Sequence, residues 1–165
     1  MDDREERRHS CCFTGHRPGK LRTPEAEIRR WLEEQISRAV ADGYTVFISG
    51  CAMGVDIWAG QIVLRKREKN PEIRLIAANP WPGMADRWDR VWRLQYEELL
   101  RGADQVETIC GCYHRYVYQQ RNAWMVDHSS RLIAYYNGLP GGTGNTVRYA
   151  EQRGLDVVLW EAGHG

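Results

Sequence analysis

Short apolar runs alternate along the chain with longer segments in which apolar residues recur every three or four positions. The runs are typical of buried strands, and they predict strands over residues 10–14, 44–49, 73–78, 106–109, 132–136 and 157–160. The longer segments are typical of amphipathic helices. They predict a helix between Thr23, as its N-cap, and Gly43, a helix that begins near Val55, and helices over residues 85–101, 116–127 and 143–153.

This alternation of strand and helix indicates βαβ units, in which crossover helices join parallel strands. The predicted fold is therefore α/β and Rossmann-like: a doubly wound, mostly parallel sheet with helices on both faces. No repeat, low-complexity linker or shift in composition interrupts residues 10–165, so we predict a single domain there. Residues 1–9 contain a run of charged side chains and are predicted to form a mobile tail outside the fold.

Length and composition place the chain among ordinary globular domains. Its 165 residues are 42% hydrophobic and 27% charged, which argues against a disordered or fibrous chain. No apolar run is long enough to cross a membrane and no signal peptide opens the sequence, so we expect a cytoplasmic protein without a membrane partner. The formal net charge of +1 provides no overall field for DNA or RNA, and no basic, aromatic surface is evident. Both observations disfavour nucleic acid as a partner.

The cysteines give little support to a metal site. Five cysteines without a regular spacing fit a reducing compartment better than a disulfide framework. Cys110, Cys112 and His114 form a C-x-C-x-H cluster, but structural zinc sites usually draw on two ligand pairs, and no second pair is apparent. We therefore interpret the cluster as part of a loop, and predict neither a bound metal nor a required cofactor.

Three glycine-bearing turns each follow a predicted strand, at residues 14–17, 49–56 and 138–146. The carboxyl ends of parallel strands meet at one edge of the sheet, which is where open α/β sheets bind ligands. Glycine lets the main chain approach a ligand closely, and the free N–H groups of the following helix favour an anion. The turns therefore predict a shared site for a phosphate-bearing, nucleotide-like ligand.

The candidate ligand-binding residues lie in or near these turns, after the third predicted strand, or on the fourth predicted helix. They are Thr14, Gly15, His16, Arg17, Ser49, Gly50, Gly54, Asp56, Asn79, Trp81, Arg121, Asn122, Gly141, Gly142, Thr143 and Thr146. Asp56 either caps a helix or contacts a ribose hydroxyl, and His16 either touches phosphate or makes a structural hydrogen bond. Trp81 is a candidate for stacking on a base, whereas Trp88 and Trp92 have the helical spacing of core or dimer packing.

The turns match neither standard nucleotide fingerprint, because the sequence lacks G-x-x-x-x-G-K-[ST] and has no G-x-G-x-x-G after its first strand. They belong instead to four longer motifs. These are Thr-Gly-His-Arg-Pro at 14–18, Ser-Gly-Cys-Ala-Met-Gly-Val-Asp at 49–56, Arg-Asn at 121–122 with Met-Val-Asp at 125–127, and Gly-Gly-Thr-Gly-Asn-Thr at 141–146 with Tyr-Ala at 149–150. With these motifs the sequence resembles the SLOG superfamily, the Rossmann-like group that contains the LOG nucleotide hydrolases and the DNA-processing protein DprA. The resemblance is closest to its YpsA-type branch.

The resemblance implies a nucleotide-derived ligand, such as a nucleoside monophosphate, ADP-ribose or an NAD-like molecule. LOG enzymes cleave the bond between base and ribose phosphate, with an arginine in R-K-x-x-M and a glutamate that closes P-G-G-x-G-T-x-x-E. Arg121 and Met125 match the first motif, but Asn122 stands at its lysine position. In the second motif Asn145 stands at the later threonine position and Arg148 at the glutamate position.

A guanidinium can neither act as a base nor stabilise an oxocarbenium ion. Glu151 would replace the missing carboxylate only if the loop register shifted. We therefore expect binding or sensing of the ligand, with LOG-type nucleotide hydrolysis as the alternative and DprA-like nucleic-acid handling disfavoured. Catalytic residues stay unassigned. The resemblance and the abundance of tryptophan and tyrosine also predict a homodimer.

Overall fold

The computed structural model describes residues 2–161 and shows the predicted doubly wound α/β architecture. Its elements are α1 (Asp3–Arg8), β1 (Ser10–Gly15), the short 3-10 helix η1 (Pro18–Lys20), α2 (Glu25–Ala41), β2 (Val46–Ser49), α3 (Val55–Lys69), β3 (Arg74–Asn79), α4 (Arg90–Gly102), β4 (Gln105–Thr108), α5 (Val117–Asp127), β5 (Arg131–Tyr135), α6 (Gly142–Gln152) and β6 (Asp156–Leu159). The six strands form one sheet in the order β4-β3-β2-β1-β5-β6, and every neighbouring pair is parallel.

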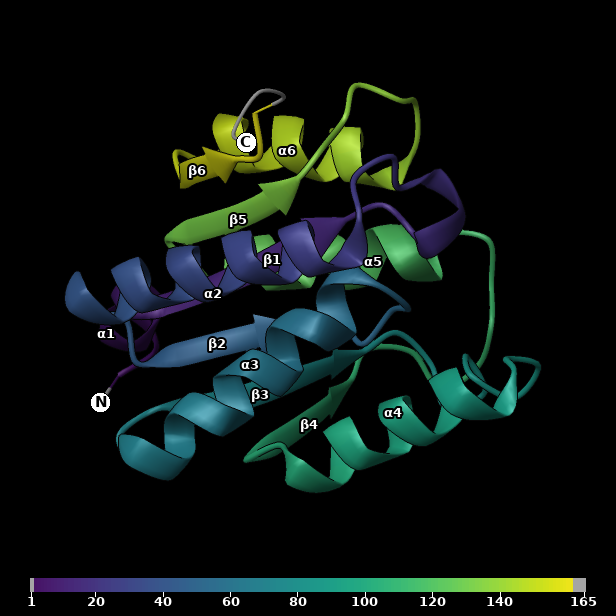
Figure 1. Cartoon of the computed structure of the whole chain (residues 1–165), viewed down its shortest axis with the longest axis horizontal. Coiled ribbons are helices and arrows are strands. Elements are labelled where there is room, and N and C mark those ends of the chain that lie inside the picture. The colour runs from purple at the N-terminus through teal and green to yellow at the C-terminus, as the bar shows by residue number, and fades with distance from the viewer. Residues whose placement is uncertain (1, 162–165) are drawn as a thin grey trace.

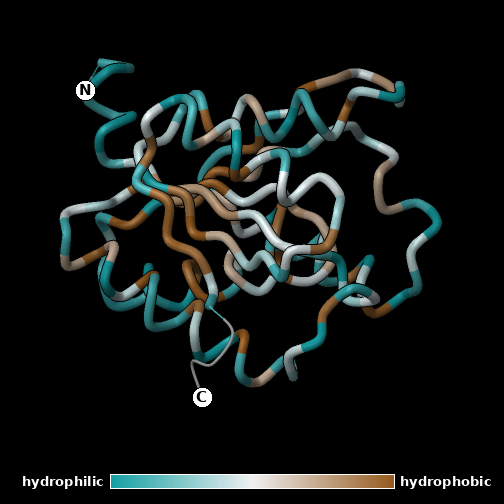
Figure 2. Tube along the Cα trace, turned by 90° about the horizontal axis from the view of Figure 1, so that it is seen from above, coloured by the Kyte–Doolittle hydropathy of each residue, from teal (hydrophilic) through white to brown (hydrophobic). Residues whose placement is uncertain are grey.

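The sheet separates two layers of helices. Helices α2, α3 and α4 cover one face, and α5 and α6 cover the other (Figure 1). Successive side chains of a strand point to opposite faces, so Phe13 packs in the core under α2 and α3 while its neighbour Cys12 packs under α5 and α6. Phe13 stacks on Phe47 across the first face, with 6.2 Å between the ring centroids. Figure 2 shows the hydrophobic residues gathered along the central strands and the hydrophilic ones along the outer helices.

The chain reverses its direction across the sheet between β1 and β5. From β1 it passes through α2 to β2 on one side, whereas from β5 it passes through α6 to β6 on the other. Helices α2 and α6 lie on opposite faces (Figure 1), so the loops after β1 and β5 leave the sheet in opposite directions. A doubly wound sheet opens a crevice at such a topological switch point.

The N-terminal segment differs from its prediction. Residues 3–8 form helix α1, whose N-cap Asp2 accepts a hydrogen bond from the Glu5 amide at 2.8 Å. Acidic residues in its first turn and basic ones in its last turn suit the helix dipole. The helix is held to the domain, because Arg7 Nε donates to the Ser129 carbonyl at 3.3 Å and the Ser10 hydroxyl donates to the Glu6 carbonyl at 2.7 Å. The prediction of a tail outside the fold is therefore wrong for these residues; residue 1 and residues 162–165 lie outside the described part.

Two helix starts also differ from the prediction. The N-cap of α2 is Pro24, because the hydroxyl of Thr23 is engaged with the Tyr135 hydroxyl at 2.6 Å. Helix α4 begins at Arg90 instead of residue 85, where Asp89 caps it by accepting from the Trp92 amide at 3.1 Å. None of the helices over residues 2–161 is both long enough and apolar enough to cross a membrane.

Candidate functional site

A cavity of about 230 Å³ lies at the switch point. The residues that line it come from β1 and the loop after it, the turn into α3, helix α5 and the start of α6. They are Thr14, Gly15, His16, Arg17, Lys20, Ala52, Asp56, Tyr118, Arg121, Asn122, Gly141, Gly142 and Thr143. We call this space the switch-point cavity. It brings together most of the residues that the sequence analysis singled out.

Glycines 15 and 141 allow the main chain to form this cavity. A Cβ atom on Gly15 would lie 2.4 Å from a methyl carbon of Val55, so only glycine lets β1 approach the start of α3 this closely. Gly141 is the N-cap of α6 and has a φ of 146°, a conformation that L side chains rarely adopt. The first-turn N–H groups of α6 have no partner within the helix. Two of them belong to Gly142 and Thr143, which line the cavity.

Arg121 is a buried cation at the base of the site. One of its terminal nitrogens donates to the Gly50 carbonyl, and its Nε donates to Oδ1 of Asn122 at 2.7 Å. Its Cζ atom also lies 5.9 Å from the centre of the Tyr118 ring. The Cζ atom of Arg17 lies 5.6 Å from the centre of the same ring. These contacts fix the guanidinium in place before any ligand arrives.

Asp56 is the acidic residue of the cavity lining. Burial raises its pKa from the ordinary value of 3.8 to about 6, although the nearby Arg121 guanidinium and the Ala52 amide lower it. The Ala52 N–H donates to Oδ2 at 3.4 Å, whereas Oδ1 has no hydrogen-bond partner among residues 2–161. Asp56 also stands in the first turn of α3. Its carboxylate suits the dipole of α3 but does not cap the helix, whose N-cap is Gly54 without a side-chain hydrogen bond.

His16 lines the cavity and makes the structural hydrogen bond that was one of its two predicted roles. Its Nε2 accepts a hydrogen bond from the Asn137 amide at 3.2 Å, which ties the loop after β1 to the loop after β5. Burial and the charge of Lys20 lower its pKa below the ordinary value of 6.5. The lowered pKa favours the neutral form of the ring.

Several predicted residues do not line the cavity. They are Ser49, Gly50, Gly54, Asn79, Trp81 and Thr146. The Ser49 hydroxyl donates to the Asp56 carbonyl at 2.8 Å, and Oδ1 of Asn79 accepts from the Tyr96 hydroxyl at 2.8 Å, so both side chains stabilise the fold. Trp81 packs against the core and the Tyr113 ring.

Thr146 turns its hydroxyl back to the Gly142 carbonyl within α6, at 2.8 Å. Lys20, Ala52 and Tyr118 line the cavity without having been predicted. Lys20 lies two residues beyond the Thr-Gly-His-Arg-Pro motif, so an extension of that motif would have found it. Ala52 lies inside the motif at 49–56 but was not among the residues chosen from it. Tyr118 carries no motif signal.

The C-x-C-x-H cluster forms part of the loop before α5. Sγ of Cys110 lies 3.4 Å from Nε2 of His114 and 2.9 Å from Oε1 of Gln120. In the part of the chain that the structure describes, no three His, Cys, Asp or Glu side chains are placed to hold a metal ion.

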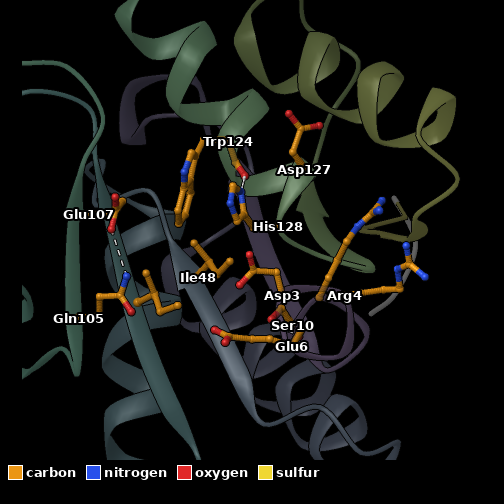
Figure 3. Close-up of a pocket in the computed structure, with 12 residues that line it drawn as sticks. Asp3, Arg4, Glu6, Ser10, Ile48, Gln105, Glu107, Trp124, Asp127 and His128 are labelled. Carbon is orange, nitrogen blue, oxygen red and sulfur yellow. Dashed lines mark hydrogen bonds between the residues drawn. The ribbon is translucent and has the colours of Figure 1, made fainter. Parts of the chain in front are cut away.

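A larger cavity, of about 570 Å³, lies on the α5 face of the sheet, away from the predicted residues. Figure 3 shows Trp124 and His128 side by side at one wall, Glu107 to their left, and Asp3 and Glu6 of α1 below them, beyond Ile48. Over residues 2–161 none of these three carboxylates has an ion-pair partner within 4.0 Å. Four carboxylates line this space, those of Asp3, Glu6, Glu107 and Asp127, against two arginines, Arg4 and Arg7. We call it the acidic groove, because this excess of negative charge disfavours a phosphate.

The strand order and the cavity at the switch point define a Rossmann-like domain. The profile of the YspA SLOG family matches residues 11–153, and the chain therefore belongs to this family. The resemblance seen in the motifs is thus confirmed.

Relatives and solved structures agree with this assignment. The chain is 30% identical to the SPbeta prophage-derived protein YoqJ of Bacillus subtilis over 126 residues, which cover 69% of this chain and 74% of YoqJ. It is 26% identical to a UPF0398 protein of Halalkalibacterium halodurans over 129 residues, 76% of this chain and 68% of the relative. The DprA structures from Streptococcus pneumoniae and Helicobacter pylori have TM-scores of 0.62 and 0.59, each at 14% identity and over 93% of this chain. The chain spans about half of the first (51%) and 67% of the second, and the likeness shows the fold alone.

Proposed function

We propose that the protein binds or senses a phosphate-bearing, nucleotide-derived ligand in the switch-point cavity. The ligand class is a nucleoside monophosphate, ADP-ribose or an NAD-like molecule. The observation that carries the proposal is the meeting of a helix N-terminus with three cations: α6 begins at the cavity wall, which also contains Arg17, Lys20 and Arg121. Each of these features favours an anion, and arginine matches phosphate with two parallel hydrogen bonds.

The order of the site supports binding without large rearrangement. Arg121 is held by the Gly50 carbonyl and by Asn122, and Gly141 already has the positive φ with which α6 begins at the cavity wall. A preformed site loses less conformational entropy on binding than a mobile one. Arg17 is exposed at the mouth, where it is placed to meet an incoming charge.

A thermal-shift panel of AMP, GMP, ADP-ribose, NAD and cyclic nucleotides tests the proposal. A ligand present at one hundred times its Kd stabilises the folded state by about 2.7 kcal/mol, and we expect at least one member to raise the unfolding midpoint by several degrees. If no member raises the midpoint at millimolar concentration, the proposal is wrong.

Hydrolysis of the ligand is the second candidate function, and Asp56 is the observation that favours it. A buried carboxyl with a pKa of about 6 inside a cavity has the character of a general acid or base. Arg148, at the position of the LOG glutamate, is exposed and donates to Asn145 outside the cavity. Release of free base from nucleoside monophosphates by the wild type, lost in Asp56→Asn, would establish this activity; binding without base release would leave sensing as the function.

Single-stranded DNA is a third candidate. The DprA of Helicobacter pylori has a single-stranded DNA binding mode, and the loop before α5 exposes Tyr113 and Tyr116, with Arg115 over the Tyr116 ring at 5.0 Å. Bases stack on such aromatic rings. Retention of labelled oligonucleotides that weakens with salt would favour this function over the small ligand. The homodimer stays a prediction, which sedimentation at micromolar concentration tests.

A further inference from the structure

A second cavity adjoins the switch-point cavity and opens between α5 and α6. Its volume is about 260 Å³, and its wall includes Gln119, Asn122, Ala123, Gly142, Asn145 and Tyr149. Asn122 and Gly142 line both cavities. The two spaces therefore share a wall at the N-terminus of α6, where the proposed phosphate lies.

The volumes indicate one ligand site in two parts. Small-molecule sites usually have volumes of about 300–1,000 Å³. Neither the switch-point cavity, at about 230 Å³, nor its neighbour, at about 260 Å³, reaches this range alone. If the two cavities are joined at Asn122 and Gly142, their combined volume falls within this range.

The lining of the second cavity is complementary to a neutral, planar ligand. Its lining contains no charged side chain, in contrast to the cations of the switch-point cavity. Three amide side chains contribute to it: those of Gln119, Asn122 and Asn145. Oδ1 of Asn122 already accepts from Arg121, and Oδ1 of Asn145 accepts from Arg148, so the amide N–H₂ groups of both are the atoms left for a guest.

Asparagine and glutamine amides form paired hydrogen bonds with the edges of nucleobases. Tyr149 adds an aromatic wall, and its ring is fixed because the hydroxyl donates to Oδ1 of Asp127 at 2.7 Å. A base between α5 and α6 would thus meet amide donors at its edge and an aromatic ring beside it.

We propose that the cavity between α5 and α6 is the subsite for the heterocyclic base of a nucleotide whose phosphate lies at the start of α6. This inference rests on the proposed function and narrows it, because it requires the ligand to carry a nucleobase next to its sugar phosphate. Ribose 5-phosphate then occupies only the switch-point cavity.

The test compares a nucleotide with its base-free counterpart by calorimetric titration. The probes are ribose 5-phosphate and whichever of AMP, GMP, CMP and UMP binds the wild type most tightly. Ala123→Phe fills the second cavity, and Gln152→Phe adds the same bulk to an exposed position of α6 that lines neither cavity. We expect Ala123→Phe to weaken nucleotide binding at least tenfold and to change ribose 5-phosphate binding less than twofold, while Gln152→Phe changes neither.

A second variant removes the amides without adding bulk. The double substitution Gln119→Ala and Asn145→Ala should weaken the nucleotide about fivefold and leave ribose 5-phosphate unchanged, and it keeps the test valid if Ala123→Phe does not fold. Nucleotide affinity that survives both changes overturns the subsite and leaves the proposed function standing. Wild-type protein that binds neither probe overturns both.

Discussion

The switch-point cavity and the acidic groove lie in the same domain and differ in nearly every property that decides what a cavity binds. The groove is the larger, at about 570 Å³ against 230 Å³, but its wall presents more carboxylates (Asp3, Glu6, Glu107 and Asp127) than arginines (Arg4 and Arg7). The switch-point cavity is smaller and presents Arg17, a helix N-terminus and a buried guanidinium. The comparison teaches that charge and free backbone N–H groups, and not size, are the reasons to propose the switch-point cavity as the phosphate site.

The origin of the two cavities also differs. Loops at the carboxyl ends of β1 and β5 build much of the switch-point cavity, whereas the groove is bounded by α1, the end of α5 and the strands β2, β3 and β4. The first position follows from the doubly wound topology itself. The second depends on a short N-terminal helix that the topology does not require.

The largest effect is expected from replacing Arg121, the buried cation that most distinguishes the switch-point cavity from the acidic groove. Replacing it by alanine leaves the Gly50 carbonyl and the Asp56 carboxylate buried without their cation. We expect the free energy of unfolding to fall by about 3 kcal/mol and ligand binding to be lost, as measured by urea unfolding and thermal shift. Arg115→Ala, on the exposed loop, serves as the control. Equal stability of the two variants would contradict the role of Arg121.

The buried carboxyl of Asp56 predicts a pH effect of similar size. Its pKa is 3.8 in the ordinary state and about 6 in the folded protein, so the native state holds the proton more tightly. The stability that this proton provides is full below pH 3.8 and is lost as the pH rises to about 6, a change of about 3 kcal/mol.

Asp56→Asn removes this titration. Urea unfolding at pH 4, 5, 6 and 7 should therefore show the wild type losing stability relative to the variant as the pH rises. If the difference in free energy of unfolding between the two proteins stays constant over this range, Asp56 does not have a raised pKa in the folded protein.

A smaller effect is expected at Gly15, whose close contact with α3 shapes the cavity. Gly15→Ala places a methyl group against Val55 and should destabilise the protein by about 2 kcal/mol through overpacking. Gly19→Ala is a matched control in the same loop, because a Cβ atom there has no neighbour within 4 Å. Thermal unfolding of both variants provides the measurement, and a similar midpoint for the two would contradict the packing argument.

The smallest effect sharpens the comparison of charge directly. Arg17→Glu at the mouth of the switch-point cavity should weaken nucleotide binding about tenfold, which corresponds to about 1.4 kcal/mol, with little change in stability because Arg17 is exposed. Arg4→Glu makes the same change at the acidic groove and should alter the affinity less than twofold. If calorimetric titration shows that Arg4→Glu weakens binding and Arg17→Glu does not, the ligand binds in the acidic groove instead.

The fold could be predicted from the sequence because the four central strands, β1, β2, β3 and β5, are largely buried apolar runs, although the edge strands β4 and β6 are more exposed. The start of α4 could not, since Asp89 offers a better cap than the residues before it, and α1 was missed because a charged hexamer has no apolar face to detect. For the site, a strand end identifies the right edge of the sheet but not the direction of a side chain. Asn79 ends β3 as expected, yet Tyr96 of α4 reaches it and draws it into the fold. Tyr118 enters the cavity only through the placement of α5, which no local pattern encodes.

Chemical-shift mapping of the ¹⁵N-labelled protein with AMP tests the central claim most directly, because it reports which amides meet the ligand. The account predicts that the largest shifts occur at Gly15, Gly142 and Thr143 and that the indole N–H of Trp124 in the acidic groove does not move. Shifts centred on Trp124 and Glu107, with the α6 amides unchanged, would contradict it.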